Sequence, residues 1–164
     1  MSRLTALVLT AAALLTAATP ALAQNASQIA SVKRGASCSG CNLFQGDFSG
    51  LERDGLNLSG ARLRQADLSL SVMNRTRLSN TDMRDVEAYG AVLSGSNFSG
   101  ANLTNASFVG AYLRGANFSR ANLSGVNFSG ADLSRATGLS TGQLAQACGD
   151  GSTILSGGLR IRAC

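Results

Sequence analysis

The chain has 164 residues, with 14 basic and 9 acidic side chains, four cysteines, and neither histidine nor tryptophan. The absence of histidine removes the commonest general base and the commonest metal ligand, so composition argues against most hydrolases and metalloenzymes. The length is enough for one domain.

Residues 1–23 are typical of a secretory signal peptide. Arg3 supplies a positive start, Leu4–Ala18 is an apolar run without charge, and Ala21-Leu22-Ala23 has the small residues of a cleavage site. The run is too short and wrongly flanked for a spanning helix, with an uncleaved anchor as the alternative. The sequence therefore predicts a periplasmic or secreted bacterial protein with no stable membrane anchor after cleavage.

Residues 24–35 are predicted to form an N-terminal cap segment. Within it, Ala26–Arg34 could form a short helix over the first coil of the structure that follows. Gly35 would end this helix, because glycine tolerates the positive φ common at helix C-termini.

From Ala36 to Arg135 the chain repeats every five residues without a slip. The third residue of each block is Leu, Phe, Met or Cys, apart from Arg53 and Ala88, and the first is usually small or apolar. Neither an α-helix nor a continuous strand places residues five apart on one face. The pattern predicts short extended pieces joined by bends, with first and third residues inward and the frequent fifth-place glycines at the bends.

Blocks such as Ala101-Asn102-Leu103-Thr104-Asn105 and Ala131-Asp132-Leu133-Ser134-Arg135 resemble the A-(D/N)-L-x-x consensus of the pentapeptide-repeat family. The resemblance implies an all-β fold, a right-handed quadrilateral β-helix over residues 36–135, with about five coils and short helical caps. Four blocks would make one coil, so residues 20 apart would stack. The interior columns would be Leu43-Leu63-Met83-Leu103-Leu123, Phe48-Leu68-Ala88-Phe108-Phe128, Leu58-Leu78-Phe98-Phe118 and Arg53-Met73-Leu93-Leu113-Leu133.

Arg53 falls at the open end of its column, where an inward charge is costly. We expect its side chain to turn toward solvent and the first coil to be distorted near Leu51–Gly55. The alternative is that Arg53 has a functional role.

The charged surface residues should also stack. Asp47, Asp67 and Glu87 would form an acidic row, in which like charges could raise a carboxyl pKa or bind a cation. Arg62 should form an ion pair with Asp82 one coil away. The densest basic group falls on several faces and is mixed with acids, which indicates a solvated surface with weak ion pairs rather than the continuous basic track that nucleic acids need. This group consists of Arg62, Arg64, Arg75, Arg77 and Arg84.

Val72, Val92 and Tyr112 should form a short apolar stripe, flanked by Glu52 and Asp132. This stripe is the better candidate for contact with a protein partner, although single exposed apolar residues are ordinary.

Residues 136–164 are predicted to form a C-terminal cap. A helix is expected over Ser140–Ala147, with Ser140 or Thr141 as its N-cap, followed by an extended tail. The tail resembles the C-terminal segment of many exported bacterial pentapeptide proteins, where a Cys-Gly-Asp step precedes a final cysteine.

Four cysteines in an exported chain favour disulfides over metal or redox chemistry, and they allow three connectivities. The preferred pairs are Cys38–Cys41 and Cys148–Cys164, one at each end of the coils. Cys38 and Cys41 occupy a third and a first place, so both should face inward. The spacing of Cys38 and Cys41 also occurs in redox motifs, and a zinc site is the remaining alternative.

The sequence therefore predicts an exported, non-catalytic scaffold or protein-interaction module, with no catalytic residues, cofactor or metal. The resemblance also implies an alternative, a DNA mimic that modulates DNA gyrase. The basic net charge and the signal peptide disfavour that alternative. An enzyme built on the acidic row is a third hypothesis, which the smooth rod of the predicted fold disfavours.

Overall fold

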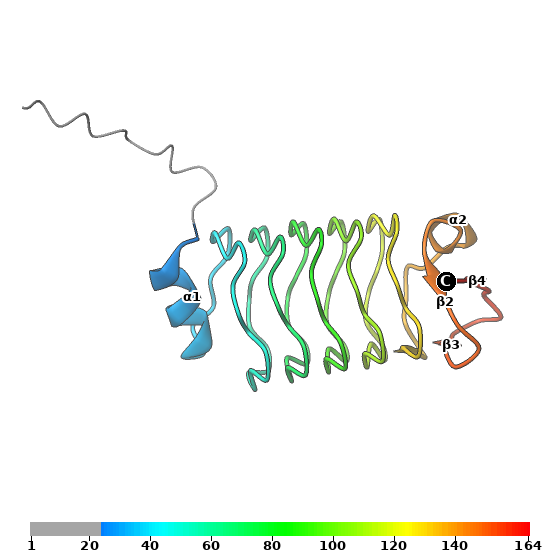
Figure 1. The fold of residues 1–164 in the computed structure, drawn as a ribbon, viewed down its shortest axis with the longest axis horizontal. Coiled ribbons are helices and arrows are strands. Elements are labelled where there is room, and N and C mark those ends of the chain that lie inside the picture. Colours follow the sequence, from blue (N-terminus) through cyan, green and yellow to red (C-terminus); the bar gives the residue numbers. More distant parts are fainter. Residues whose placement is uncertain (1–23) are drawn as a thin grey trace, which may run out of the picture.

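The structure is a computed structural model that describes residues 24–164, so the predicted signal peptide lies outside the described residues. Helix α1 stands at one end, the coils follow side by side, and the C-terminal elements stand at the other end (Figure 1). No helix among residues 24–164 is long and apolar enough to cross a membrane. The elements are α1 (Ala26–Lys33), β1 (Asp132–Leu133), α2 (Thr141–Leu144), β2 (Cys148–Gly149), β3 (Ile154–Leu155) and β4 (Arg162–Ala163).

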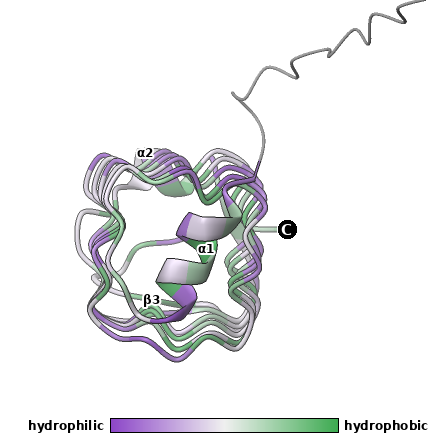
Figure 2. Ribbon diagram, turned by 90° about the vertical axis from the view of Figure 1, so that its left-hand side faces the viewer, coloured by the Kyte–Doolittle hydropathy of each residue, from purple (hydrophilic) through white to green (hydrophobic). Residues whose placement is uncertain are grey.

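The repeat region winds into a β-helix in which every coil is hydrogen-bonded to the next. Parallel bridges join residues 20 apart, for example Asn57 with Arg77. The Leu63 amide donates to the Asp82 carbonyl at 2.7 Å, and the Asp82 amide donates back to the Ala61 carbonyl at 3.0 Å. Viewed along its axis, the stack of coils has a four-sided outline (Figure 2). The predicted stacking of residues 20 apart is confirmed.

The bends use a positive φ at the fifth place of the block, whichever residue stands there. Gly95 has φ 68°, and non-glycine residues at the same place reach 52° to 60°. These conformations cost side-chain-bearing residues more than glycine, and the closed ladder around them holds them in place. The residues are Gln45, Gln65, Leu70, Arg75, Asn80, Asp85, Asn105, Arg120 and Arg135.

The Asn or Asp at the second place of many blocks stabilises the turn that follows it by a side-chain hydrogen bond. The side-chain oxygen of Asn97 accepts a hydrogen bond from the Ser99 amide at 3.0 Å, and that of Asp67 accepts one from the Ser69 amide at 2.8 Å. This is the Asx turn, in which a short polar side chain satisfies a backbone donor two residues on. The consensus (D/N)-x-(S/T) thus follows from turn chemistry.

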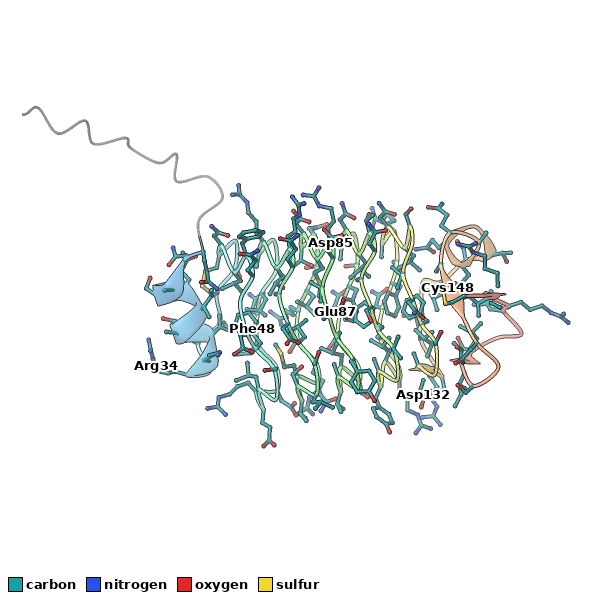
Figure 3. All side chains as sticks on the ribbon, viewed as in Figure 1. Arg34, Phe48, Asp85, Glu87, Asp132 and Cys148 are labelled. Atoms are coloured by element: carbon teal, nitrogen blue, oxygen red, sulfur yellow. A yellow bond between two sulfur atoms is a disulfide. The ribbon has the colours of Figure 1, made fainter. Side chains whose placement is uncertain are left out.

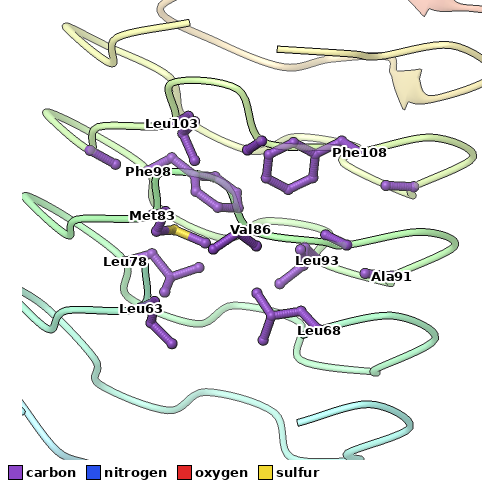
Figure 4. Close-up of a cluster of buried hydrophobic side chains, with 14 of the residues drawn as sticks. Leu63, Leu68, Leu78, Met83, Val86, Ala91, Leu93, Phe98, Leu103 and Phe108 are labelled. Carbon is purple, nitrogen blue, oxygen red and sulfur yellow. The ribbon is translucent and has the colours of Figure 1, made fainter. Parts of the chain in front are cut away.

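Large side chains from the third places fill the interior. Figure 4 shows Leu63, Met83, Leu103 and Phe108 among the buried side chains that point toward one another. The ring of Phe98 stacks on that of Phe118 at 5.0 Å and meets Phe108 edge-on at 5.9 Å. Apart from Arg53, every member of the four predicted columns is buried.

Arg53 is exposed as expected, but the predicted distortion of Leu51–Gly55 is wrong. The Arg53 amide donates to the Val72 carbonyl at 2.9 Å in the ordinary ladder. Its side chain lies against Gly35, where a Cβ would be 3.2 Å from the Arg53 Cδ, and Nη1 donates to the Glu52 carbonyl at 2.7 Å. No coil precedes this one in the column, so a long side chain can leave the core without moving the backbone.

Helix α1 crosses the open end of the first coil (Figure 2) and buries Ile29 and Val32. Its N-cap is Asn25, whose side chain accepts from the Gln28 amide at 3.2 Å. Gly35 follows the helix with φ 95°.

Helix α2 is shorter than predicted, and Ser140 is its N-cap. Ser140 and Gln143 form a capping box, and Gln143 Nε2 also donates to the Phe118 and Ala121 carbonyls at 3.0 Å each. These two hydrogen bonds from the Gln143 side chain fix α2 to the end of the stack of coils. Leu144 is buried there.

The C-terminal tail is not simply extended, as the sequence predicted, but continues the coil pattern. Cys148 bridges Asn127, and Ile154 in β3 pairs with Asp132 in β1. The Ile154 amide donates to the Ala131 carbonyl at 2.9 Å. These pairs satisfy backbone groups of the last coil that would otherwise lack partners.

The structure joins the cysteines in the preferred pairs. Cys38 and Cys41 are disulfide-bonded with Cα atoms 5.5 Å apart, as are Cys148 and Cys164 with Cα atoms 4.8 Å apart. Cys41 is buried, whereas Cys38 is only partly buried. The second bond holds the C-terminus beside β2.

Replacing Phe98 with Ala should lower the free energy of unfolding by about 3–5 kcal/mol, because it leaves a cavity between two rings that close packing cannot refill. Phe98→Leu should cost less, roughly 1–2 kcal/mol, since Leu58 and Leu78 occupy the same column. Urea unfolding followed by circular dichroism measures both. Equal losses for the two variants would contradict this account of the core.

Candidate functional site

The predicted stripe is continuous on one face of the β-helix. Val72 bridges Val92, and Val92 bridges Tyr112. The two valines are partly buried, and Tyr112 is 55% exposed. Glu52 bridges Val72 and Asp132 bridges Tyr112, so the stripe begins and ends at a carboxylate.

The apolar surface is larger than sequence reasoning indicated. Leu70 is 63% exposed and Tyr89 is 57% exposed, and both lie on the bend that leads into the stripe. The Leu70 amide donates to the Tyr89 carbonyl at 2.8 Å, and the Leu70 side chain lies over Gly90, within 3.0 Å of where a Cβ would be. Val109 follows Tyr89 one coil later. We call Leu70, Val72, Tyr89, Val92, Val109 and Tyr112 the apolar patch.

The sequence pattern did not place Leu70 and Tyr89 together, because Leu70 is the fifth residue of its block and Tyr89 is the fourth. Residues that stack at a spacing of 20 always share the same place in the block. At the bend the ladder joins the fifth place of one coil to the fourth place of the next. The signal available in the sequence was two large apolar residues at bend positions that are usually Ser and Gly. Ile154, also exposed, pairs with Asp132 one step beyond the end of the stripe.

The charges around the apolar patch are unevenly distributed. Asp47, Asp67 and Glu87 stack on the adjoining face, as predicted. On the bend that follows the stripe, away from Leu70 and Tyr89, Arg75 forms an ion pair with Asp54 at 3.3 Å. Figure 3 shows Glu87 and Asp132 among the side chains of the coils.

The expectation that stacking raises a carboxyl pKa in the acidic row is wrong for Asp47. Ser49 donates to Asp47 from its hydroxyl at 2.6 Å and from its amide at 3.0 Å, and Lys33 Nζ lies at 3.2 Å. These donors, with the Ser49 hydroxyl first, lower the pKa of Asp47 to about 2. Local hydrogen bonds outweigh repulsion between exposed carboxylates of successive coils.

The predicted ion pair between Arg62 and Asp82 is also wrong. The two residues stack, but Asp82 receives two hydrogen bonds of 2.7 Å from Nε and Nη2 of Arg84. This pair lowers the pKa of Asp82 and raises that of Arg84. Arg84 stands at the bend two residues after Asp82, close enough for its guanidinium to reach that carboxylate twice, and Arg62 is exposed one coil away.

Two other arginines of the basic group have acidic partners. Arg64 Nε lies 3.5 Å from Asp85, in addition to the Arg75–Asp54 pair. Three of the five arginines of the basic group are therefore paired with acids on the surface, in keeping with the weak, solvated pairs that the sequence indicated.

A polar hollow of about 240 Å³ lies at another bend, lined by Asn80, Ser99, Gly100 and Arg120. Arg120 supplies the one charge of this lining, so the hollow holds no acid–base pair. Among residues 24–164, no three His, Cys, Asp or Glu side chains come together as metal ligands.

The Asp47 carboxylate should titrate near pH 2 in the folded protein, measured by carbon-13 NMR of its carboxyl group. Because the pKa is lowered from 3.8, its contribution to stability is present above pH 3.8 and is lost as the pH falls toward 2. Ser49→Ala should return the pKa toward 3.8, and Lys33→Met should move it less. A larger effect from Lys33→Met would show that the ion pair, not the serine, lowers the pKa.

A protein-family model described as "Pentapeptide repeats" matches the chain in eight copies, over residues 54–87, 86–120 and 96–135. Together these segments span half of the sequence. No curated protein sequence matches the chain significantly.

Several solved structures resemble the chain. Trypsin-treated QnrB1, a plasmid-mediated fluoroquinolone resistance protein, is 20% identical over 77% of this chain and 80% of its own, with a TM-score of 0.38. A pentapeptide repeat protein of the Arabidopsis thaliana thylakoid lumen is 26% identical over 76% of this chain and 61% of its own, with a TM-score of 0.29. Rfr23, a pentapeptide repeat protein from the cyanobacterium Cyanothece 51142, is 26% identical over 79% of this chain and 98% of its own, with a TM-score of 0.29.

Proposed function

The chain belongs to the pentapeptide-repeat family, whose fold is a right-handed β-helix, and we propose that it is an exported, non-catalytic interaction module. The observation that carries the proposal is the position of the exposed large hydrophobic residues. Leu70, Tyr89, Tyr112 and Ile154 all lie on one face of the described coils or on the bend beside it. Contiguous exposed apolar surface of this kind marks interaction sites in soluble proteins.

The chemistry of the apolar patch suits protein recognition. Tyrosine contributes a large, rigid contact area together with a hydroxyl group, and it is enriched among residues that dominate binding energy. The backbone at Tyr89 and Tyr112 is held by the hydrogen-bonded ladder, so no backbone entropy need be lost when a partner covers these residues.

We further propose that the ends of the solenoid are closed by caps, with about five coils between them. Ile29 and Val32 of α1 cover the first coil, and Leu144 beside α2 covers the last. The exposed core at each end would otherwise favour end-to-end association of the rods. The capped ends leave the side faces as the surfaces on which a partner can bind.

The proposed export rests on the signal-peptide pattern of residues 1–23 and on the cysteine pairing. Disulfides persist in oxidising compartments and are rare in the cytosol. Cys38–Cys41 fastens the start of the coils, and Cys148–Cys164 fastens the tail.

The full chain, expressed in a bacterium, should appear in the periplasmic or secreted fraction with Gln24 as its first residue. Its four cysteines should all resist a maleimide reagent until a reductant is added, with the mass of the adduct as the measurement. The matched control lacks residues 1–23 and should remain in the cytoplasm with reactive thiols. Recovery of the uncleaved chain with free thiols in the cytoplasm would contradict the export proposal.

The DNA-mimic function gains no support from the described surface. A duplex mimic needs a dense acidic surface, whereas this chain has a net charge of +5, and its arginines neutralise Asp54, Asp82 and Asp85. The interaction module therefore remains the function that the geometry supports best.

A photo-crosslinking residue at Tyr112 of the mature protein should capture one protein from periplasmic extract, because Tyr112 is an exposed member of the apolar patch. The matched control carries the same residue at Arg62, on the opposite side of the coils, and should capture nothing. Unlabelled mature protein should compete, and a Leu70→Ser, Val92→Ser variant should not. Equal capture from both positions would contradict the proposal.

A further inference from the structure

The apolar patch has an acidic rim, although the chain as a whole is basic. We propose that its partner is a cationic apolar segment of another protein, in which lysine or arginine residues flank aliphatic or aromatic side chains. This inference rests on the proposed function, because it specifies the chemistry of the partner for the same surface.

The acids without a basic partner gather around the apolar patch. Asp47, Asp54, Asp82 and Asp85 each form an ion pair. Within the described residues, Glu52, Asp67 and Glu87 form none. Asp67 and Glu87 lie on the face next to Leu70 and Tyr89, and Glu52 stands at one end of the stripe.

The remaining two acids do not change this distribution. Asp132 stands at the other end of the stripe, where its carboxylate accepts from the Ser134 amide at 2.8 Å. Hydrogen bonds from Ser134, and to a smaller extent the charge of Arg114, lower the pKa of this carboxyl. Asp150 holds the tail by accepting from the Gly130 and Ser152 amides at 3.0 and 2.9 Å. Negative charge without an ion pair is thus concentrated along one side of the patch, at Asp67 and Glu87, and at its Glu52 end.

The spacing of these acids limits the size of the partner segment. Glu52 and Asp132 are separated by four coil steps of the ladder, which is about 19 Å at the usual strand spacing of about 4.8 Å. An extended segment covers that distance with about six residues. Apolar side chains would pack on Val72, Val92 and Tyr112, and a basic residue at each end of the segment would reach an acid.

A second copy of this chain fits the surface poorly. If two stripes faced each other in parallel, Glu52 would meet its own counterpart, and so would Asp132. In the antiparallel arrangement Glu52 would meet Asp132. Each arrangement brings like charges together at the edge of the contact, which is unfavourable. Anionic lipid surfaces are disfavoured for the same electrostatic reason.

The chain contains a built-in reporter of this surface. It has two tyrosines and no tryptophan, and both tyrosines belong to the apolar patch. Tyrosine emission therefore responds to events at the patch and to no other part of the protein.

The test uses the mature protein and two synthetic peptides without tyrosine or tryptophan, KKLVALFKK and EELVALFEE. The lysine peptide should change the tyrosine emission in a saturable way, and its Kd should rise at least about tenfold when salt increases from 50 to 300 mM. The glutamate peptide should have no effect. The double variant Glu52→Gln, Glu87→Gln should weaken binding of the lysine peptide by about tenfold, whereas Asp85→Asn, which removes an acid from a distant bend, should bind as the parent does.

Circular dichroism of each variant establishes that it folds. Equal binding of the two peptides, or binding that does not depend on salt, would overturn the cationic class and leave the patch as a protein-binding surface. A response to anionic phosphatidylglycerol vesicles, or to neither peptide, would also overturn it. The crosslink from Tyr112 decides the proposed function separately, because it requires no assumption about charge.

Discussion

The backbone ladder between coils is the constraint on which the rest of the structure depends. Each coil of 20 residues must donate and accept hydrogen bonds to its neighbours at the same heights, as Asp82 does with Ala61 and Leu63. The ladder directs the first and third side chains inward in the blocks that have a coil on both sides, whereas Arg53, which no coil precedes in its column, is exposed. It also holds residues such as Leu70 and Asn105 at positive φ, a conformation they would otherwise avoid.

Because the ladder is regular, surface chemistry is arranged in rows, and local geometry decides what each row does. Exposed charges one coil apart interact weakly through water. Donors at a bend are closer and better aligned, so Ser49 controls Asp47, and Arg84 controls Asp82. Glu52, Asp67 and Glu87 form no ion pair within the described residues, so the rim of the apolar patch differs from the bends where arginines pair with acids.

Much of the fold could be predicted from the sequence, because the five-residue period leaves few structures that bury Leu and Phe. The interior columns and the preferred cysteine pairs are those of the structure. Of the apolar patch, only the stripe Val72, Val92 and Tyr112 was predicted from the sequence, together with the flanking acids Glu52 and Asp132. The course of the tail was harder to predict. Cys148 pairs with Asn127 and Ile154 with Asp132, at spacings of 21 and 22 residues that depart from the period of 20.

The sequence by itself determined the coil, its inward residues and the turn chemistry of Asn and Ser, because each depends on contacts that recur at a constant spacing. The tertiary structure alone decided which acids have partners, that the backbone around Arg53 stays regular, and that Leu70 and Tyr89 adjoin the stripe. These features depend on how side chains bend around corners and across the open end, where directions in space no longer follow from position in the repeat.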